Sequence, residues 1–176
     1  RSEKNEQIKV ITSDNSWLNF ASKKSILDGV LRDELAQLTT KDGTPRYSWD
    51  KVYTTLKDIS TKELHYVLIS DEHHIVIDFD LKDKDGNKSL ERNLAAAAMF
   101  PPTYAELSKS GSGIHLHYIY KGDVSRLRNL YATDIEVKVF TGKSSLRRKL
   151  SYCNALPITS ISSGLPLKEE KKVAVD

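Results

Sequence analysis

Ile75-Val76-Ile77-Asp78-Phe79-Asp80 is the stretch on which both the predicted fold and the predicted site depend. In a β-strand, successive side chains leave opposite faces, so Asp78 and Asp80 share one face while Ile75, Ile77 and Phe79 share the other. Mg²⁺ takes oxygen ligands and completes its shell with waters and phosphates. A strand with one apolar face and paired carboxylates on the other therefore predicts a site for a divalent cation.

Two later segments show the same division of faces. Their polar members are His115 and His117 within residues 113–120, and Asp134, Glu136 and Lys138 within residues 133–140. If the apolar sides of all three strands pack on helices, then His115, Glu136 and the two aspartates lie on one open sheet surface. Three carboxylates on such a surface predict a pair of cations, an arrangement suited to phosphoryl transfer.

The remaining pattern predicts the other elements and the fold class. Helices are predicted over residues 22–38, 48–56, 89–100, 123–131 and 144–152, and further strands over 66–70 and 103–109. We expect the 66–70 strand to form a hairpin with 75–80. The order predicts an α+β fold, an open antiparallel sheet backed by helices. Its parts are a mostly helical N-terminal portion (1–65), a catalytic core (66–165) and a solvated tail or linker (166–176).

Composition narrows the class of protein. The chain has 176 residues, 39% of them hydrophobic, and no apolar run approaches the roughly 20 residues of a membrane span. We therefore expect no membrane partner. The single Cys153 excludes an internal disulfide and any zinc site built from several cysteines, which favours a cytoplasmic location. The chain does not begin with Met, and we expect it to be a domain of a longer protein.

Basic residues gather in one segment although the net charge is only +3. Residues 121–150 hold eight basic and three acidic residues, which predicts a phosphate-facing patch or, alternatively, an ordinary solvated surface. Three aromatic residues, Trp17, Tyr47 and Trp49, have side chains able to stack on bases. Aromatic residues at helical spacing are more often core, so we leave these outside the predicted site.

Three motifs in order carry a family resemblance: Asp78-Phe79-Asp80, then Ser110-Gly111-Ser112-Gly113-Ile114-His115, then Ile135-Glu136. Together they resemble the motifs of archaeo-eukaryotic primases, and in particular the primase-polymerase domains of phages, plasmids and other mobile elements. The resemblance covers residues 66–165. It implies an RRM-like catalytic sheet and template-directed synthesis of a nucleic-acid strand.

The resemblance also implies roles for individual residues. Asp78, Asp80 and Glu136 would hold two Mg²⁺ or Mn²⁺ ions, and with His115 they form the predicted catalytic set. Ser110, Gly111, Gly113 and His115 would bind the incoming nucleotide. The predicted nucleotide-binding set also includes Lys138, which shares the face of Glu136 but is not part of the family motif. Lys143, Arg147 and Arg148 of the basic segment complete it. The implied substrates and partners are dNTPs or NTPs, a primer, a single-stranded DNA template and a helicase domain or protein.

Two other classes of function stay open at this point. Asp78 followed by Glu136-Val137-Lys138 also fits the acidic-x-lysine pattern of metal-dependent nucleases, in which the lysine helps to activate water. That interpretation leaves the segment from Ser110 to His115 unexplained. A non-catalytic module would bind nucleic-acid strands without needing a metal.

Overall fold

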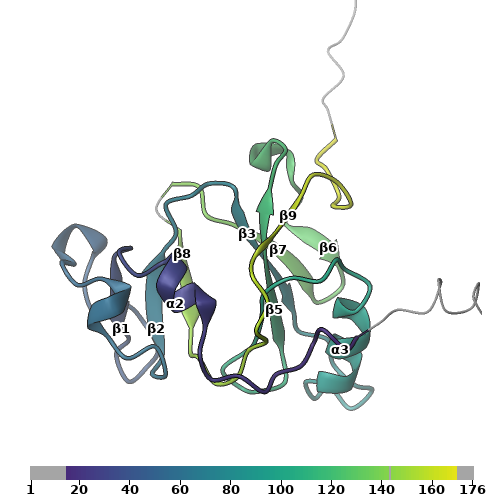
Figure 1. Cartoon of the computed structure of the whole chain (residues 1–176), viewed down its shortest axis with the longest axis horizontal. Helices are drawn as coiled ribbons and strands as arrows, with labels where there is room; N and C mark the ends of the chain where they lie inside the picture. Colours follow the sequence, from purple (N-terminus) through teal and green to yellow (C-terminus); the bar gives the residue numbers. More distant parts are fainter. Residues whose placement is uncertain (1–14, 143, 170–176) are drawn as a thin grey trace, which may run out of the picture.

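The computed structural model describes residues 15–142 and 144–169 and arranges them as two β-sheets with two short helices (Figure 1). In chain order the elements are α2 (Ile26–Val30), β1 (Ala36–Leu38), the 3₁₀ turns η1 (Trp49–Lys51) and η2 (Leu56–Asp58), β2 (His65–Leu68), β3 (His74–Phe79), α3 (Leu90–Ala97), β4 (Ala105–Leu107), β5 (Ile114–Tyr120), the 3₁₀ turn η3 (Val124–Arg126), β6 (Leu130–Ala132), β7 (Ile135–Val139), β8 (Ser145–Arg148) and β9 (Thr159–Ile161). Within these residues no helix combines the length and apolar character that a membrane crossing requires.

The larger sheet has the strand order β4-β5-β3-β7-β6, and β9 extends it by pairing in parallel with β5. All its other pairs are antiparallel. The strand β3 lies at the centre of this sheet, and five of its six residues, His74 to Ile77 and Phe79, are buried. A strand covered on both faces for most of its length needs a neighbour on each side to pair its backbone groups.

One face of this sheet packs against α3, which lies at the right of Figure 1. Ile77 and Phe79 of β3 lie there beside Leu116 of β5 and Val137 of β7, all of them fully or almost fully buried. The Ser89 hydroxyl caps α3 by accepting a hydrogen bond from the Arg92 amide. The helix ends shortly before Pro101-Pro102, as the sequence predicts.

The opposite face of the large sheet is only partly covered. A second, three-stranded sheet of order β1-β2-β8 packs there with α2, at the left of Figure 1. Val76 of β3 and Tyr104, the residue before β4, belong to a separate apolar core with Val67, Leu146 and Leu27. This second core ends before Asp78, so the face is buried near Val76 and open near the end of β3.

The predicted fold class was wrong. The described residues form two sheets with only two short helices, α2 and α3, so the chain is β-rich and not a sheet backed by helices. The expected helical N-terminal portion consists of α2, two 3₁₀ turns and the strand β1 wherever it is described. Residues 1–14 and 170–176 of the predicted portions lie outside the described residues.

The helices predicted over 48–56 and 123–131 are replaced by the 3₁₀ turns η1 and η3 and, from Leu130, by β6. Three further predictions failed for physical reasons that the structure supplies. Residues 66–70 do not pair with 75–80, because β2 instead pairs with β1 and with the distant β8. The helix predicted over 22–38 stops at Val30, whose side chain is exposed and unsupported, and Ala36–Leu38 gain backbone partners in β2. The helix predicted over 144–152 does not form, because Ser145–Arg148 are the strand β8, in which buried and more exposed side chains alternate.

Candidate functional site

One row of residues across four adjacent strands forms the centre of the candidate site. The ladder pairs Glu106 of β4 with His115 of β5, His115 with Asp78 of β3, and Asp78 with Glu136 of β7. Directly opposite residues of an antiparallel ladder share a face, with Cβ atoms about 4.5–5.5 Å apart. The sequence predicted Asp78, His115 and Glu136 on matching faces, and the register places them side by side.

Asp78 lies between a histidine and a lysine. Its Oδ1 lies 3.2 Å from His115 Nε2, and its Oδ2 lies 3.2 Å from Lys138 Nζ. Burial by itself would raise the pKa of Asp78, but the hydrogen bond and charge of His115, with those of Lys138, outweigh it and lower the pKa to about 2. Asp78 is therefore ionised at neutral pH.

Asp80 follows the end of β3 and lies between two lysines. Its amide continues the ladder by donating to the Asp134 carbonyl, 2.8 Å away. Lys82 Nζ lies 3.4 Å from one carboxylate oxygen and Lys88 Nζ lies 3.7 Å from the other. A turn over residues 83–87, closed by a bridge between the two lysines, places both cations next to the carboxylate.

A cavity of ≈ 190 Å³ opens along this row, between the large sheet and β8. Its lining contains five cations and His115 against two carboxylates. The lining residues are Leu64, Asp78, Phe79, Asp80, Lys88, Ser108, Lys109, Gly113, His115, Lys138, Arg147 and Lys149. The cavity is smaller than the roughly 300–1,000 Å³ of pockets that enclose a whole drug-sized ligand. Its size and charge suit phosphate groups, with the remainder of such a ligand outside.

The turn between β4 and β5 borders the cavity and is rigid. Gly111 has a φ of 79°, a conformation that favours glycine. A Cβ on Gly113 would lie 2.9 Å from Ser108 Oγ and 3.1 Å from the Phe79 carbonyl, so glycine is required for close packing. The amides of Gly111, Ser112 and Gly113 all donate within the turn.

This use of the amides changes the predicted role of the turn. Because these three amides are used internally, a phosphate in the cavity would meet side chains instead. Ser108 and Lys109 supply them. The Ser110 hydroxyl lies 3.0 Å from Ser108 Oγ and accepts from the Ser112 amide, so it stabilises the turn.

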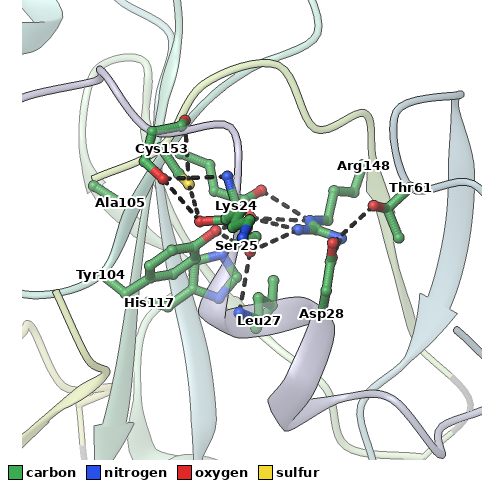
Figure 2. Close-up of polar contacts among 12 residues, drawn as sticks. Lys24, Ser25, Leu27, Asp28, Thr61, Tyr104, Ala105, His117, Arg148 and Cys153 are labelled. Atoms are coloured by element: carbon green, nitrogen blue, oxygen red, sulfur yellow. Dashed lines mark hydrogen bonds and ion pairs between the residues drawn. The ribbon is translucent and has the colours of Figure 1, made fainter. Parts of the chain in front are cut away.

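The placement of Arg148 contradicts its predicted role in nucleotide binding. Side chains of β8 alternate, so Arg147 lines the cavity whereas Arg148 points into the space between the sheets with a side chain only 1% exposed. Its guanidinium binds Glu106 in a fork, with Nε 2.9 Å from Oε1 and Nη2 2.7 Å from Oε2, and Nη1 lies 2.8 Å from Asp28 Oδ1 (Figure 2).

Arg148 belongs to a buried network that joins three parts of the chain. Ser25, the N-cap of α2, accepts from Arg148 Nη2 and contacts the Tyr104 hydroxyl (Figure 2). The Tyr104 hydroxyl in turn donates to Glu106. Burial would raise the pKa of Glu106, but the charge of Arg148 outweighs it and lowers the pKa to about 2. The network fixes the small sheet and α2 to the open row.

Some site residues escaped the sequence analysis. These are Lys88 and Lys109, which line the cavity from loops. Lys149, a member of the basic segment that was predicted as a phosphate-facing patch, also lines the cavity and follows β8. The alternation Arg147-Arg148-Lys149 is the signal that separates exposed from buried side chains, once the segment is taken as a strand. The predicted Lys143 lies outside the described residues.

The donor set at the row fits Mg²⁺ or Mn²⁺ in its chemistry. Both ions prefer carboxylate oxygens, which Asp78, Asp80 and Glu136 offer, and Asp78 carries no proton to displace at neutral pH. In residues 15–142 and 144–169 no three Asp, Glu, His or Cys side chains already converge as a ligand set. Metal binding therefore requires Asp80 and the exposed Glu136 to rotate toward Asp78, with the lysines exchanging partners.

The sequence was also compared with models of known protein families and with curated proteins, and neither comparison found a match. The primase resemblance therefore depends on the three motifs alone.

Proposed function

We propose that this chain is a metal-dependent nucleotidyl transferase of the primase-polymerase kind, which joins nucleotides to a primer 3′-hydroxyl or to an initiating nucleotide on a single-stranded DNA template. The observation that carries the proposal is the ladder register, which aligns the key residues of all three motifs, Asp78, His115 and Glu136, on neighbouring strands. The proposal depends on the site and not on the fold class, since one chemistry recurs on unrelated folds.

The cations around the cavity would bind the triphosphate of the incoming nucleotide. Lys88, Lys109, Lys138, Arg147 and Lys149 border the same space, and their charge suits a substrate with several negative charges. His115 lies at the floor of the cavity with its Nε2 toward Asp78. It would position a phosphate oxygen next to the carboxylates.

Asp78, Asp80 and Glu136 would hold two Mg²⁺ or Mn²⁺ ions. Such ions would neutralise the triphosphate and its leaving pyrophosphate and lower the pKa of the attacking hydroxyl. On metal binding, Lys82 and Lys138 would be free to leave the carboxylates for phosphate. A cytoplasmic location and a helicase as a partner belong to the same proposal.

A metal-dependent nuclease is the second candidate, because one observation favours it. Asp78 and Glu136 lie directly opposite each other on adjacent strands, and Lys138 reaches Asp78. That is the arrangement an acidic-x-lysine nuclease needs. A nuclease mechanism gives no role to three cations of the cavity lining, which are Lys109, Arg147 and Lys149. In a transferase these three side chains would bind the triphosphate.

Primer extension tests the proposal. A primed template is incubated with labelled dNTPs or NTPs and Mg²⁺ or Mn²⁺, and we expect wild type to lengthen the primer. Asp78→Ala should lose extension by at least about 100-fold, because removal of a single preorganised electrostatic group costs that much. Asp85→Ala is the matched control, since Asp85 is an exposed acid on the neighbouring loop and lies outside the cavity lining.

The three classes of function give different products in this assay. Shortened DNA in place of extension would favour the nuclease. Strand binding without any change of length, under every metal and nucleotide condition, would leave a binding module and overturn both enzymes.

A further inference from the structure

A second concave surface lies on the small sheet, away from the row of carboxylates. This groove of ≈ 330 Å³ lies between β1 and the segment 46–59. Val52 and Ile59 contribute apolar floor, and Tyr47 and Tyr53 form its walls. Tyr47 is 60% exposed and Tyr53 is 86% exposed. Tyr47 is therefore not a core residue, contrary to what its spacing in the sequence favoured.

The groove also carries positive charge. Arg46 and Lys51 belong to its lining, and among the described residues the lining includes no acid. Aromatic walls with cations at the edge are the combination that binds unpaired nucleic acid, because bases stack on the rings while phosphates meet the cations. An apolar peptide would offer no counter-charge to Lys51 or to Arg46, whose Nε already donates to the Thr39 carbonyl.

The rigid loop 39–47 connects this groove to the candidate site. The amide and carbonyl of Tyr47 bond the Gln37 side chain of β1, with N···O distances of 2.8 and 2.9 Å. At the other end, the Gly43 carbonyl accepts from the Tyr66 hydroxyl of β2. A Cβ on Gly43 would lie 3.7 Å from Arg147 Nη1, and Arg147 lines the cavity.

The distance between the groove and the cavity suits one continuous nucleic-acid strand that reaches both. Four residues from Gly43 to Tyr47 span about 13 Å at most, given roughly 3.3 Å per extended residue. A nucleic-acid strand that advances about 3.4 Å per nucleotide along its axis covers that distance in a few nucleotides.

We propose that the groove between Tyr47 and Tyr53 binds bases of a single-stranded nucleic acid whose adjoining nucleotides lead to the Asp78 cavity. The role of this strand as template rests on the proposed function, whereas the binding of the strand does not. Arg46 and Lys51 contact the backbone at the groove, and Arg147 contacts it at the entrance to the cavity.

The test measures binding of the full chain to a fluorescent oligo(dT) by anisotropy, in EDTA and without nucleotides. The double variant Tyr47→Ala/Tyr53→Ala should weaken binding by about 10-fold or more, since a base–aromatic stack contributes roughly 1–3 kcal/mol. Both side chains are mainly exposed, so we expect the variant to fold, which circular dichroism checks. Tyr47→Phe/Tyr53→Phe should retain binding.

Two controls make the result specific. Tyr131→Ala removes an exposed tyrosine that packs on Phe100, on the opposite face of the large sheet, and should leave binding unchanged. Lys51→Gln should reduce the slope of log K against log salt by about 0.7, the value of one phosphate contact on a single strand. Wild-type binding by the tyrosine-to-alanine variant, equal loss in Tyr131→Ala, or no oligo(dT) binding by wild type would overturn the proposal.

Primer extension separates this proposal from the proposed function. If the groove is right and the enzyme wrong, the alanine variant loses oligonucleotide binding although wild type extends no primer. If the enzyme is right and the groove wrong, the alanine variant extends primers with a wild-type KM for template and binds oligo(dT) normally.

Discussion

Glu106 and Asp78 lie on either side of His115 in one row of the same sheet, yet they are held in different ways. Both carboxyl groups have a pKa lowered to about 2. Glu106 reaches that state through the guanidinium of Arg148, buried between the sheets, whereas Asp78 reaches it through His115 and the half-exposed Lys138.

The difference separates a structural ion pair from an exchangeable one. A guanidinium that bonds a carboxylate in a fork is preorganised, and a buried partner has no alternative to exchange with. A lysine on a flexible stem at the edge of a cavity can leave for a phosphate or give way to a metal. The comparison predicts stability effects at the Glu106 end of the row and functional effects at the Asp78 end.

The largest expected effect is on stability at the buried end. Arg148→Ala leaves Glu106 buried without its counter-charge, which typically costs about 3–5 kcal/mol of the free energy of unfolding. Urea denaturation measures it. Arg147→Ala, on the exposed face of the same strand, should change stability by no more than about 0.5 kcal/mol. Replacing both partners, as in Glu106→Leu/Arg148→Met, should restore much of the loss.

At the Asp78 end of the row, we expect a substitution to affect function more than stability. Asp78→Asn keeps the shape of the side chain and should change stability far less than Arg148→Ala does. If instead Asp78→Asn unfolds the protein and Arg148→Ala leaves it stable, the assignment of the two ends is reversed.

The second effect is an acid sensitivity confined to the buried core. His74 Nε2 and His117 Nδ1 lie 2.9 Å apart there. Burial lowers the pKa of His74 to about 4, against smaller opposing effects of Asp71 and Glu34. Burial also lowers the pKa of His117. The neighbouring His74 lowers this pKa further and Glu106 opposes the shift, with smaller lowering effects of His115 and Arg148.

The direction of the pH dependence follows from these shifts. The unfolded chain takes up a proton at the ordinary histidine pKa of about 6.5, whereas folded His74 does so only near pH 4. Stability is therefore full above about pH 6.5 and falls as the pH drops toward 4, by about 3 kcal/mol for such a histidine. Urea midpoints between pH 7 and 4.5 should show this fall, and His74→Gln should flatten it. His73→Gln, at an exposed neighbour, should leave the fall as steep as in wild type.

The sequence was sufficient to predict which side chains share the open face of the sheet, because apolar and polar residues alternate along each strand. A slip of one residue in β3, β5 or β7 would turn every apolar side chain toward the other face, so the buried face fixes the register of all three. Asp78, His115 and Glu136 could therefore be assigned to the same face of the sheet without knowledge of the strand order.

The sequence was insufficient for the small sheet because its pairings are distant. His65 of β2 pairs with Arg148 of β8, and nothing local distinguishes that pairing from a hairpin between β2 and β3. The leucines at 146 and 150 suit a helix and a strand equally well, so Arg147 and Arg148 looked alike. Only the pairing shows that one of them faces the cavity and the other faces Glu106.

The smallest expected effect concerns Lys138, which decides between the two candidate enzymes. In a transferase the lysine binds phosphate, so Lys138→Met should raise the KM for nucleotide by about 10–100-fold, the value of a charged hydrogen bond of roughly 1.5–3 kcal/mol, with a smaller change in kcat. Loss of its charge should also raise the pKa of Asp78, which shifts the acid limb of the rate profile to higher pH. Stability should change little, because the side chain is 39% exposed.

A nuclease predicts a different pattern for the same variant. There the lysine acts on the attacking water, so its loss should lower kcat by the 100- to 10,000-fold typical of general acid–base catalysis and leave KM almost unchanged. Lys84→Met is the matched control, since Lys84 is an exposed lysine of the neighbouring loop and does not belong to the cavity lining. A large loss of kcat in Lys138→Met that the control variant does not show would therefore identify the site around Asp78 as hydrolytic and contradict nucleotide addition.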